Sequence, residues 1–177
     1  MKLNGLKRTL AVTAACLLLA PAAFAAPEAQ GVRIPNPIVT YDTYEGAARA
    51  VGFTPLYLTR DSGYACTYIS VIDKDVADLG FTKLGQADTT VRVRTALKKN
   101  DKDNNLSGIY GYQWEKKTIN GETVQIAKLG EQEYAAQWSN GKYSFAAQAK
   151  GLEGAAFESL LSNSLVDTTD HYFLAVK

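Results

Sequence analysis

Six aromatic side chains are the first candidates for contact with a ligand. Tyr110, Tyr112 and Trp114 alternate along one predicted strand, and three more share one face of a predicted hairpin: Tyr134, Trp138 and Tyr143. Rings that carry a hydroxyl or an indole N–H can line a groove for a glycan, a peptide or a lipid. We favour the alternative, a sheet face packed against a helix, because strand-spaced aromatics usually form such faces. Buried tyrosine hydroxyls would then need partners or water, so the groove stays open as an interpretation.

Two arginines are the second candidates. The run Val91-Arg92-Val93-Arg94-Thr95 alternates strictly, so that one face of a strand is apolar and the other basic. Two guanidinium groups on one face could clamp an anionic group. The favoured alternative is the solvent side of a half-buried strand, because charged side chains usually lie there.

No catalytic residue, cofactor site or metal site is predicted. The sequence has no Gly-x-Ser-x-Gly, phosphate-binding loop or dinucleotide fingerprint. The run Asp101-x-Asp103-x-Asn105 begins like a calcium loop. However, Leu106 stands where that loop requires glycine, and Tyr112 where it requires glutamate. Two carboxylates that meet only in the folded chain, as in glycosidases, remain an alternative.

The segments that would position these side chains are predicted from caps and periodicity. Asp42 or Thr43 is expected to cap a short helix that ends at Gly52. An apolar stripe predicts a second helix over 152–165, and 166–177 favours a last strand or a docked tail. Strands are predicted at 64–72, 76–84, 91–95, 109–118, 123–129, 133–139 and from 142 onward. The fold class is therefore α+β, an antiparallel meander sheet of about six or seven strands with an N-terminal and a C-terminal helix packed on one face.

Two Asn-Gly pairs predict hairpins within this sheet. For Asn120-Gly121 the sequence leaves the register open. With Asn140-Gly141 as a two-residue turn, Trp138 pairs with Tyr143 and Tyr134 lies on the same side. The second hairpin would then have one bulky face and one small, largely polar face.

The N-terminus has the layout of a secretory signal peptide. Three basic residues precede the apolar run 10–19, and Ala23-Phe24-Ala25 fits a cleavage site. We predict a signal peptide at 1–25, an extended arm at 26–40 and a single domain at 41–177. The protein would be exported, periplasmic or secreted, and Cys16 is not expected to carry a lipid because the apolar run continues past it.

Charge and cysteine content restrict the partners. The mature chain would carry 16 basic residues (19 less the three in the signal) and 18 acidic residues. No basic surplus points to nucleic acid, and no further apolar run predicts a membrane span. Cys66 would be its single cysteine, interpreted as a small strand residue rather than a reactive thiol.

Several blocks resemble an exported bacterial family, domain of unknown function 4367. These are "NPIVTYDTYEGAARAVGF", "ISVID", "VRVRTA" and "WSNGKYSFAA", followed by a leucine-rich helix. The resemblance covers about residues 36 to 166 and concerns caps, turns and core. It implies a sensor or interaction domain outside the membrane, of a kind sometimes attached to anti-sigma factors. It transfers no functional residue to this chain.

The sequence therefore favours a non-enzymatic, extracytoplasmic binding or interaction module. Its partner would be a protein, a glycan or a lipid of the cell envelope. Two alternatives remain: a cell-envelope hydrolase with an unrecognised carboxylate pair, and a lipid or lipoprotein carrier.

Overall fold

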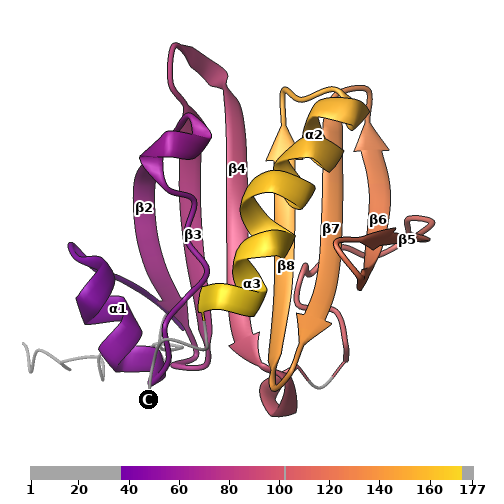
Figure 1. Ribbon diagram of the computed structural model, residues 1–177. Helices are drawn as coiled ribbons and strands as arrows, with labels where there is room; N and C mark the ends of the chain where they lie inside the picture. Colours follow the sequence, from indigo (N-terminus) through magenta and orange to yellow (C-terminus); the bar gives the residue numbers. More distant parts are fainter. Residues whose placement is uncertain (1–36, 102, 173–177) are drawn as a thin grey trace, which may run out of the picture. The chain divides into compact units, whose positions relative to one another are not determined.

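One antiparallel sheet of eight strands organises the chain (Figure 1). The computed structural model describes residues 37–101 and 103–172, so the predicted signal peptide and most of the predicted arm lie outside the described residues. The strands are β1 Ile38–Thr40, β2 Tyr64–Ile72, β3 Val76–Lys83, β4 Gln86–Leu97, β5 Glu115–Ile119, β6 Glu122–Gly130, β7 Glu133–Asn140 and β8 Tyr143–Lys150. The helices are α1 Tyr44–Val51, α2 Gly154–Leu160 and α3 Val166–Tyr172, with a π-helical turn at Leu161–Leu165 between α2 and α3.

The antiparallel sheet is confirmed, but the strand count and the single meander are wrong. The strand order is β1-β2-β3-β4-β8-β7-β6-β5, so two four-strand meanders meet where β4 pairs with β8. After β4, residues 98–114 carry the chain to the far edge of the sheet, where β5 begins. Part of the predicted arm supplies the additional strand β1, because Ile38–Thr40 pairs with the end of β2. Neither the β4–β8 pairing nor the β1–β2 pairing has a local sequence signal, since the partner strands are far apart in the chain.

The C-terminal helix is confirmed and is longer than predicted. Its stripe of Phe157, Leu161 and Leu165 is fully buried in the main core. Residues 166–172 continue the helix instead of forming a strand or tail, with Val166 buried in the main core and Thr169 also buried. In Figure 1 this helix crosses the sheet obliquely, with α2 over β7 and β8 and α3 running from β8 toward β4. None of the described helices is long and apolar enough to cross a membrane.

The first helix, α1, has the predicted caps. The Thr43 side chain accepts a hydrogen bond from the Gly46 backbone N–H at 3.1 Å, and Gly52 ends the helix with φ 75°. Thr43 rather than Asp42 is therefore the cap. α1 lies beside β2 at one side of the sheet (Figure 1), so the predicted covering of a face is confirmed only for the C-terminal helix.

The two predicted hairpins both form, with different turns. Asn120 and Gly121 have φ of 49° and 85° and join Ile119 to Glu122. In the second hairpin the turn residues are Gly141 and Lys142, so Trp138 pairs with Phe145 and not with Tyr143. The predicted register was wrong because Gly141, with φ 55°, takes the first central position of the turn, as glycine does in type II′. The shift changes each pairing by two residues, so the predicted faces are unchanged.

Candidate ligand-binding cleft

The aromatic residues of β7 and β8 belong to the packed face. Trp138 is only 4% exposed and stacks on Phe145, with ring centroids 5.4 Å apart. Tyr134 stacks on Phe157 of α2 at 5.8 Å, and Tyr143 packs against the same core. These three residues therefore join the sheet to its covering elements.

The other three aromatic residues do not share that face. Tyr110 and Tyr112 are 71% and 48% exposed and lie in the connection between β4 and β5. The half-buried Trp114 precedes β5, which begins only at Glu115. The predicted strand over 109–118 is thus wrong at its start, because Gly108 and Gly111 adopt φ of 69° and 80°, which do not fit a strand. The six aromatics form no single platform.

The two arginines lie on the opposite face of the sheet, as the alternation predicts, but they are paired with an acid. Arg92 donates two hydrogen bonds to Asp78, one of them from Nε to Oδ1 at 2.6 Å. Arg94 approaches the same carboxylate at 3.4 Å and donates from Nη1 to the carbonyl oxygens of Leu106 and Ser107, each at 3.1 Å. Arg94 therefore fastens the β4–β5 connection to the sheet, and Arg92 holds Asp78.

The pKa values of the two guanidinium groups are shifted in opposite directions. The hydrogen bond to Asp78 raises the pKa of Arg92 above its ordinary value. Burial lowers the pKa of Arg94, and the neighbouring charge of Arg92 lowers it further. The Tyr68 ring lies against Gly80 beside this group: a Cβ on Gly80 would be 2.0 Å from a Tyr68 ring carbon. Because both guanidinium groups donate to acceptors of the protein itself, we interpret Arg92 and Arg94 as structural.

A cleft opens where β6 parts from β7. The pairing of β6 with β7 ends at Gln125 and Gln137. Beyond that point β6 continues to pair with β5 as far as Glu122, and β7 continues to pair with β8 as far as Asn140. The two hairpins therefore separate at one end. We call the space between them the β6–β7 cleft.

The C-terminal helix draws the β5–β6 hairpin away from β7. Asn120 at the hairpin tip donates from its side chain to the carbonyl oxygen of Ser162 in the π-helical turn. Lys117 forms an ion pair with Glu158 of α2, with Nζ and Oε1 2.6 Å apart, and the hydrogen bond to Glu158 raises the pKa of Lys117. Ile119 and Val124 are buried in the same core as the helix stripe. These contacts favour the helix over continued pairing with β7.

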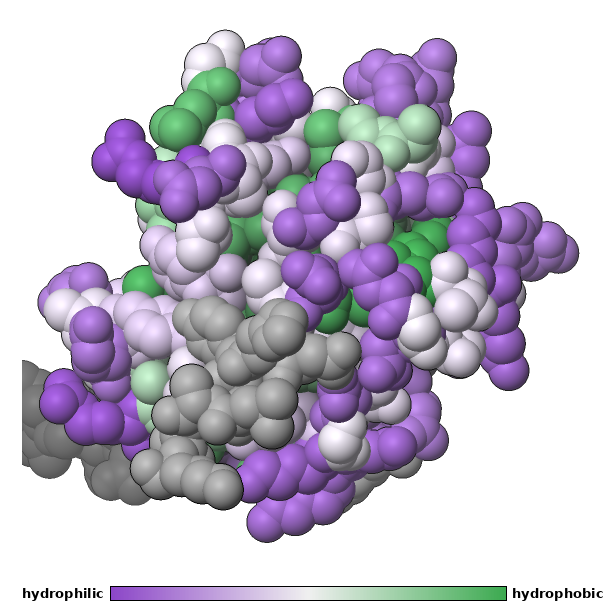
Figure 2. Space-filling model, viewed as in Figure 1, coloured by the Kyte–Doolittle hydropathy of each residue, from purple (hydrophilic) through white to green (hydrophobic). Residues whose placement is uncertain are grey.

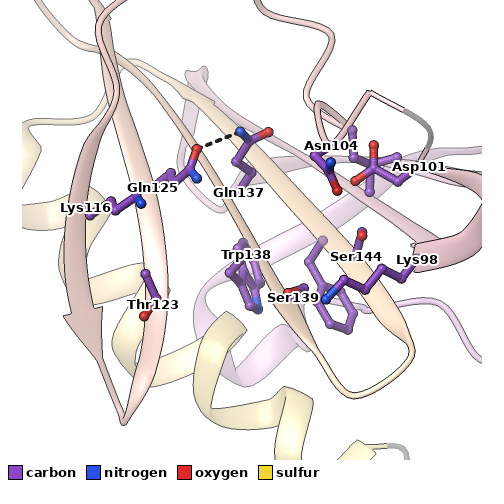
Figure 3. A pocket seen from close by; sticks show the side chains of 12 residues that line it. Lys98, Asp101, Asn104, Lys116, Thr123, Gln125, Gln137, Trp138, Ser139 and Ser144 are labelled. Atoms are coloured by element: carbon purple, nitrogen blue, oxygen red, sulfur yellow. Dashed lines mark hydrogen bonds between the residues drawn. The ribbon is translucent and has the colours of Figure 1, made fainter.

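The β6–β7 cleft has a volume of about 320 Å³, and its walls combine polar side chains with the apolar or aromatic side chains of Leu106, Trp138 and Phe145. In Figure 3 side chains of β5 and β6 line one side, β7 lies in the middle, and the β4–β5 connection closes the other side. The polar lining comprises three amides (Asn104, Gln125, Gln137), three hydroxyls (Thr123, Ser139, Ser144), two lysines (Lys98, Lys116) and one acid (Asp101). This volume is at the lower end of the range typical of ligand pockets, about 300–1,000 Å³.

Two polar atoms at the cleft are buried without a hydrogen-bond partner in the structure. They are Oε1 of Gln137 and Nε1 of Trp138, on adjacent residues of β7. The other end of the Gln137 amide is satisfied, because Nε2 donates to Gln125 Oε1 at 3.0 Å. Buried polar groups nearly always have partners, so each of these atoms is a group that a ligand or water would satisfy, although the two side chains start from opposite faces of β7.

Sequence reasoning found Trp138 but assigned it to the aromatic set, and it missed the amides and hydroxyls of the cleft. The predicted hairpin did show a small polar face on β7 and β8, which includes Gln137, Ser139 and Ser144. That signal alone places these residues on one face. It says nothing of the separation of β6 from β7.

A second hollow lies on the helix-bearing side, between α2 and the β5–β6 hairpin. It has a volume of about 350 Å³ and is lined by Ile126, Tyr134 and Phe157, with the Lys117–Glu158 ion pair at its side. Figure 2 shows a hydrophobic area in this region, among hydrophilic surface. Its polar groups include an ion pair that is already satisfied, so it has less need of a ligand than the β6–β7 cleft.

The described residues show neither a metal-holding group nor an activated thiol. No group of three or more potential ligands is placed to hold a metal ion within 37–101 and 103–172. Cys66 is half-buried in β2, and burial raises the pKa of its thiol, which disfavours the reactive thiolate. Comparisons with protein family models, curated proteins and solved structures found no match for this chain, so its resemblance to domain of unknown function 4367 stays a prediction.

Proposed function

We propose that the protein is a non-enzymatic binding module of the cell envelope, and that its ligand occupies the β6–β7 cleft. The observation that carries this proposal is the pair of buried, unpartnered atoms, Gln137 Oε1 and Trp138 Nε1, beside a cleft of ligand size. A ligand that supplies one donor and one acceptor would satisfy both. Export through the predicted signal peptide places the module outside the cytoplasm.

The composition of the cleft supports binding over hydrolysis. Glycosidase-type catalysis needs two carboxyl groups about 5–10 Å apart across the substrate. Among the residues that line the cleft, Asp101 is the single carboxylate, and its Oδ1 accepts a hydrogen bond from the Asn105 backbone at 3.0 Å. Amides and hydroxyls, which dominate the lining, orient ligands by hydrogen bonding without supplying an acid–base pair.

The lipid-carrier alternative needs an apolar cavity on the aromatic face of the sheet. That space is occupied by the helix stripe, whose Phe157, Leu161 and Leu165 have no exposed surface. A carrier function would require the helix to move away from its core. The β6–β7 cleft needs no such rearrangement.

Tryptophan fluorescence tests the proposal, because the chain has two tryptophans. A Trp114→Phe variant leaves Trp138 as the reporter at the cleft. The probes are a random decapeptide mixture and chito-oligosaccharides. We expect a saturable change in Trp138 emission with one probe class, and its loss when Ser139→Phe fills the cleft.

Thr67→Phe, at an exposed position on β2, is the matched control and should bind normally. Emission that stays unchanged with both probe classes, or binding that Ser139→Phe leaves intact, would overturn the cleft as the binding site.

A further inference from the structure

We infer that the ligand of the β6–β7 cleft is an extended peptide segment with an acidic side chain, which pairs with β7 in the place that β6 leaves. This inference rests on the proposed function and names the class of ligand. The backbone supports it first, because the pairing of β6 with β7 stops at Gln125 and Gln137, where the cleft opens.

The alternation of hydrogen bonds identifies the available backbone groups. Asn140 and Tyr143 flank a two-residue turn and form a hydrogen-bonded pair. Ser139, one residue earlier, therefore directs its N–H and C=O away from β8 and toward β6. By the same reasoning from Ile119 and Glu122, Thr123 directs its backbone groups toward β7.

Ser139 and Thr123 would be the next hydrogen-bonded pair after Gln137 and Gln125, yet the ladder has already ended. Two short strand edges thus face the cleft. An open strand edge is a template for an added strand, and adding one satisfies the backbone groups that β6 leaves behind.

The burial of Trp138 and its stacking on Phe145 argue against a glycan ligand. Sugars are commonly held against the open face of an aromatic ring, but the Trp138 indole stacks on Phe145 and is 96% buried. Only its N–H remains to be satisfied. A peptide carbonyl can accept from that N–H, and a peptide N–H can donate to Gln137 Oε1.

Charge selects among peptides. Lys98 and Lys116 come from opposite sides of the cleft, and in Figure 3 they flank the β7 residues. Asp101 is the only opposing charge in the lining, and it already accepts a backbone hydrogen bond. The two ammonium groups favour a segment with an acidic side chain, and they also protect the open edge from random pairing.

Peptide display followed by backbone methylation tests the inference. A random decapeptide library is selected against the mature protein, and one binder is resynthesised with a single N-methyl group at each position in turn. Strand addition predicts that affinity falls at least tenfold at alternate positions and stays within about twofold at the intervening ones. Replacing the acidic residue of the binder by its amide should also weaken binding, more at low salt than at high salt.

The outcomes separate the two proposals. Tolerance of N-methylation at every position, or selection of no peptide while chito-oligosaccharides bind the cleft, overturns strand addition and leaves the cleft as a binding site. Failure of both probe classes overturns the proposed function itself. Hydrogen exchange gives a second reading: bound peptide should slow exchange of the Ser139 amide of β7, and the amides of β2, at the other side of the sheet, should not change.

Discussion

The β5–β6 and β7–β8 hairpins both have an Asn-Gly pair at the turn, but their surroundings differ. The β7–β8 hairpin lies inside the sheet, because β8 pairs with β4 along its whole length and β7 pairs with part of β6. The β5–β6 hairpin lies at the edge, and its tip is attached to the helix by Asn120. The comparison teaches that the neighbours of a hairpin, rather than its turn, determine whether a strand edge is left open.

The first way to test this comparison is to remove the ring that joins the helix to the inner hairpin. Phe157 is fully buried and stacks on Tyr134 of β7. Phe157→Ala should lower the free energy of unfolding by about 3–5 kcal/mol, because it removes buried apolar surface and leaves a cavity. Urea unfolding measures the change. Tyr110→Ala, at a position 71% exposed, is the control and should change stability by less than about 0.5 kcal/mol.

The second test concerns the β4–β5 connection, which forms one wall of the cleft. Arg94 attaches this connection to the sheet. Asp78 is buried and accepts hydrogen bonds from both arginines. Asp78→Asn should cost about 2 kcal/mol, less than for a fully buried pair because the Arg92 side chain is 37% exposed. Arg92→Met in the same variant should restore part of that loss by removing one unpaired charge. A single variant as stable as the wild type would show that the connection is held mainly by Leu106.

The third test releases the outer hairpin from the helix. Asn120→Gly keeps a residue suited to φ 49° and removes the bond to Ser162. We expect a loss of about 0.5–1.5 kcal/mol and faster hydrogen exchange at the tip of β6. Asp73→Gly, in the β2–β3 turn with φ 50°, is the matched control, because it makes the same exchange of a left-handed residue for glycine. Equal effects in both variants would contradict an anchoring role.

The smallest expected effect concerns the ion pair between Lys117 and Glu158. Both side chains are about 40% exposed, so Lys117→Met should cost less than about 1 kcal/mol at pH 8. The folded state raises the pKa of Lys117, so the stabilisation is present below its ordinary pKa and is lost as the pH rises through the raised value. Thermal unfolding at pH 8 and pH 11.5 should show the difference between wild type and variant shrinking. A difference in stability between wild type and variant that grows with pH would contradict the expected direction of the pKa shift.

Local patterns predicted many details of this molecule correctly. The cap of α1 at one of two adjacent residues, which the structure shows to be Thr43, and its end at Gly52 follow from preferences within one helical turn. The alternation around Arg92 gave the correct faces of β4, because side chains of a strand point to opposite sides in turn. The register of the β7–β8 hairpin was wrong by two residues, yet the face of Trp138 was correct for the same reason.

Features that depend on distant contacts were missed. Nothing near β4 in the sequence signals that it pairs with β8, because the residues between them form three other strands. The helix extends to Tyr172 because the sheet offers it a surface to cover, and the local sequence of 166–172 is ambiguous. The six predicted aromatic residues separated into core and surface for a different, local reason: two left-handed glycines, Gly108 and Gly111, end the strand pattern before β5.

Local sequence patterns establish which side chains can share a face, where turns and caps fall, and that the sheet is antiparallel, since these follow from the period of two, from φ preferences and from short connections. Contacts between distant segments establish that the arginines pair with Asp78 and that β6 parts from β7. The cleft is the result of a competition: β6 can pair further with β7, or its hairpin can bury Ile119 and Val124 against the helix. Such a competition is settled by buried area and hydrogen bonds between segments far apart in the chain, which no local pattern encodes.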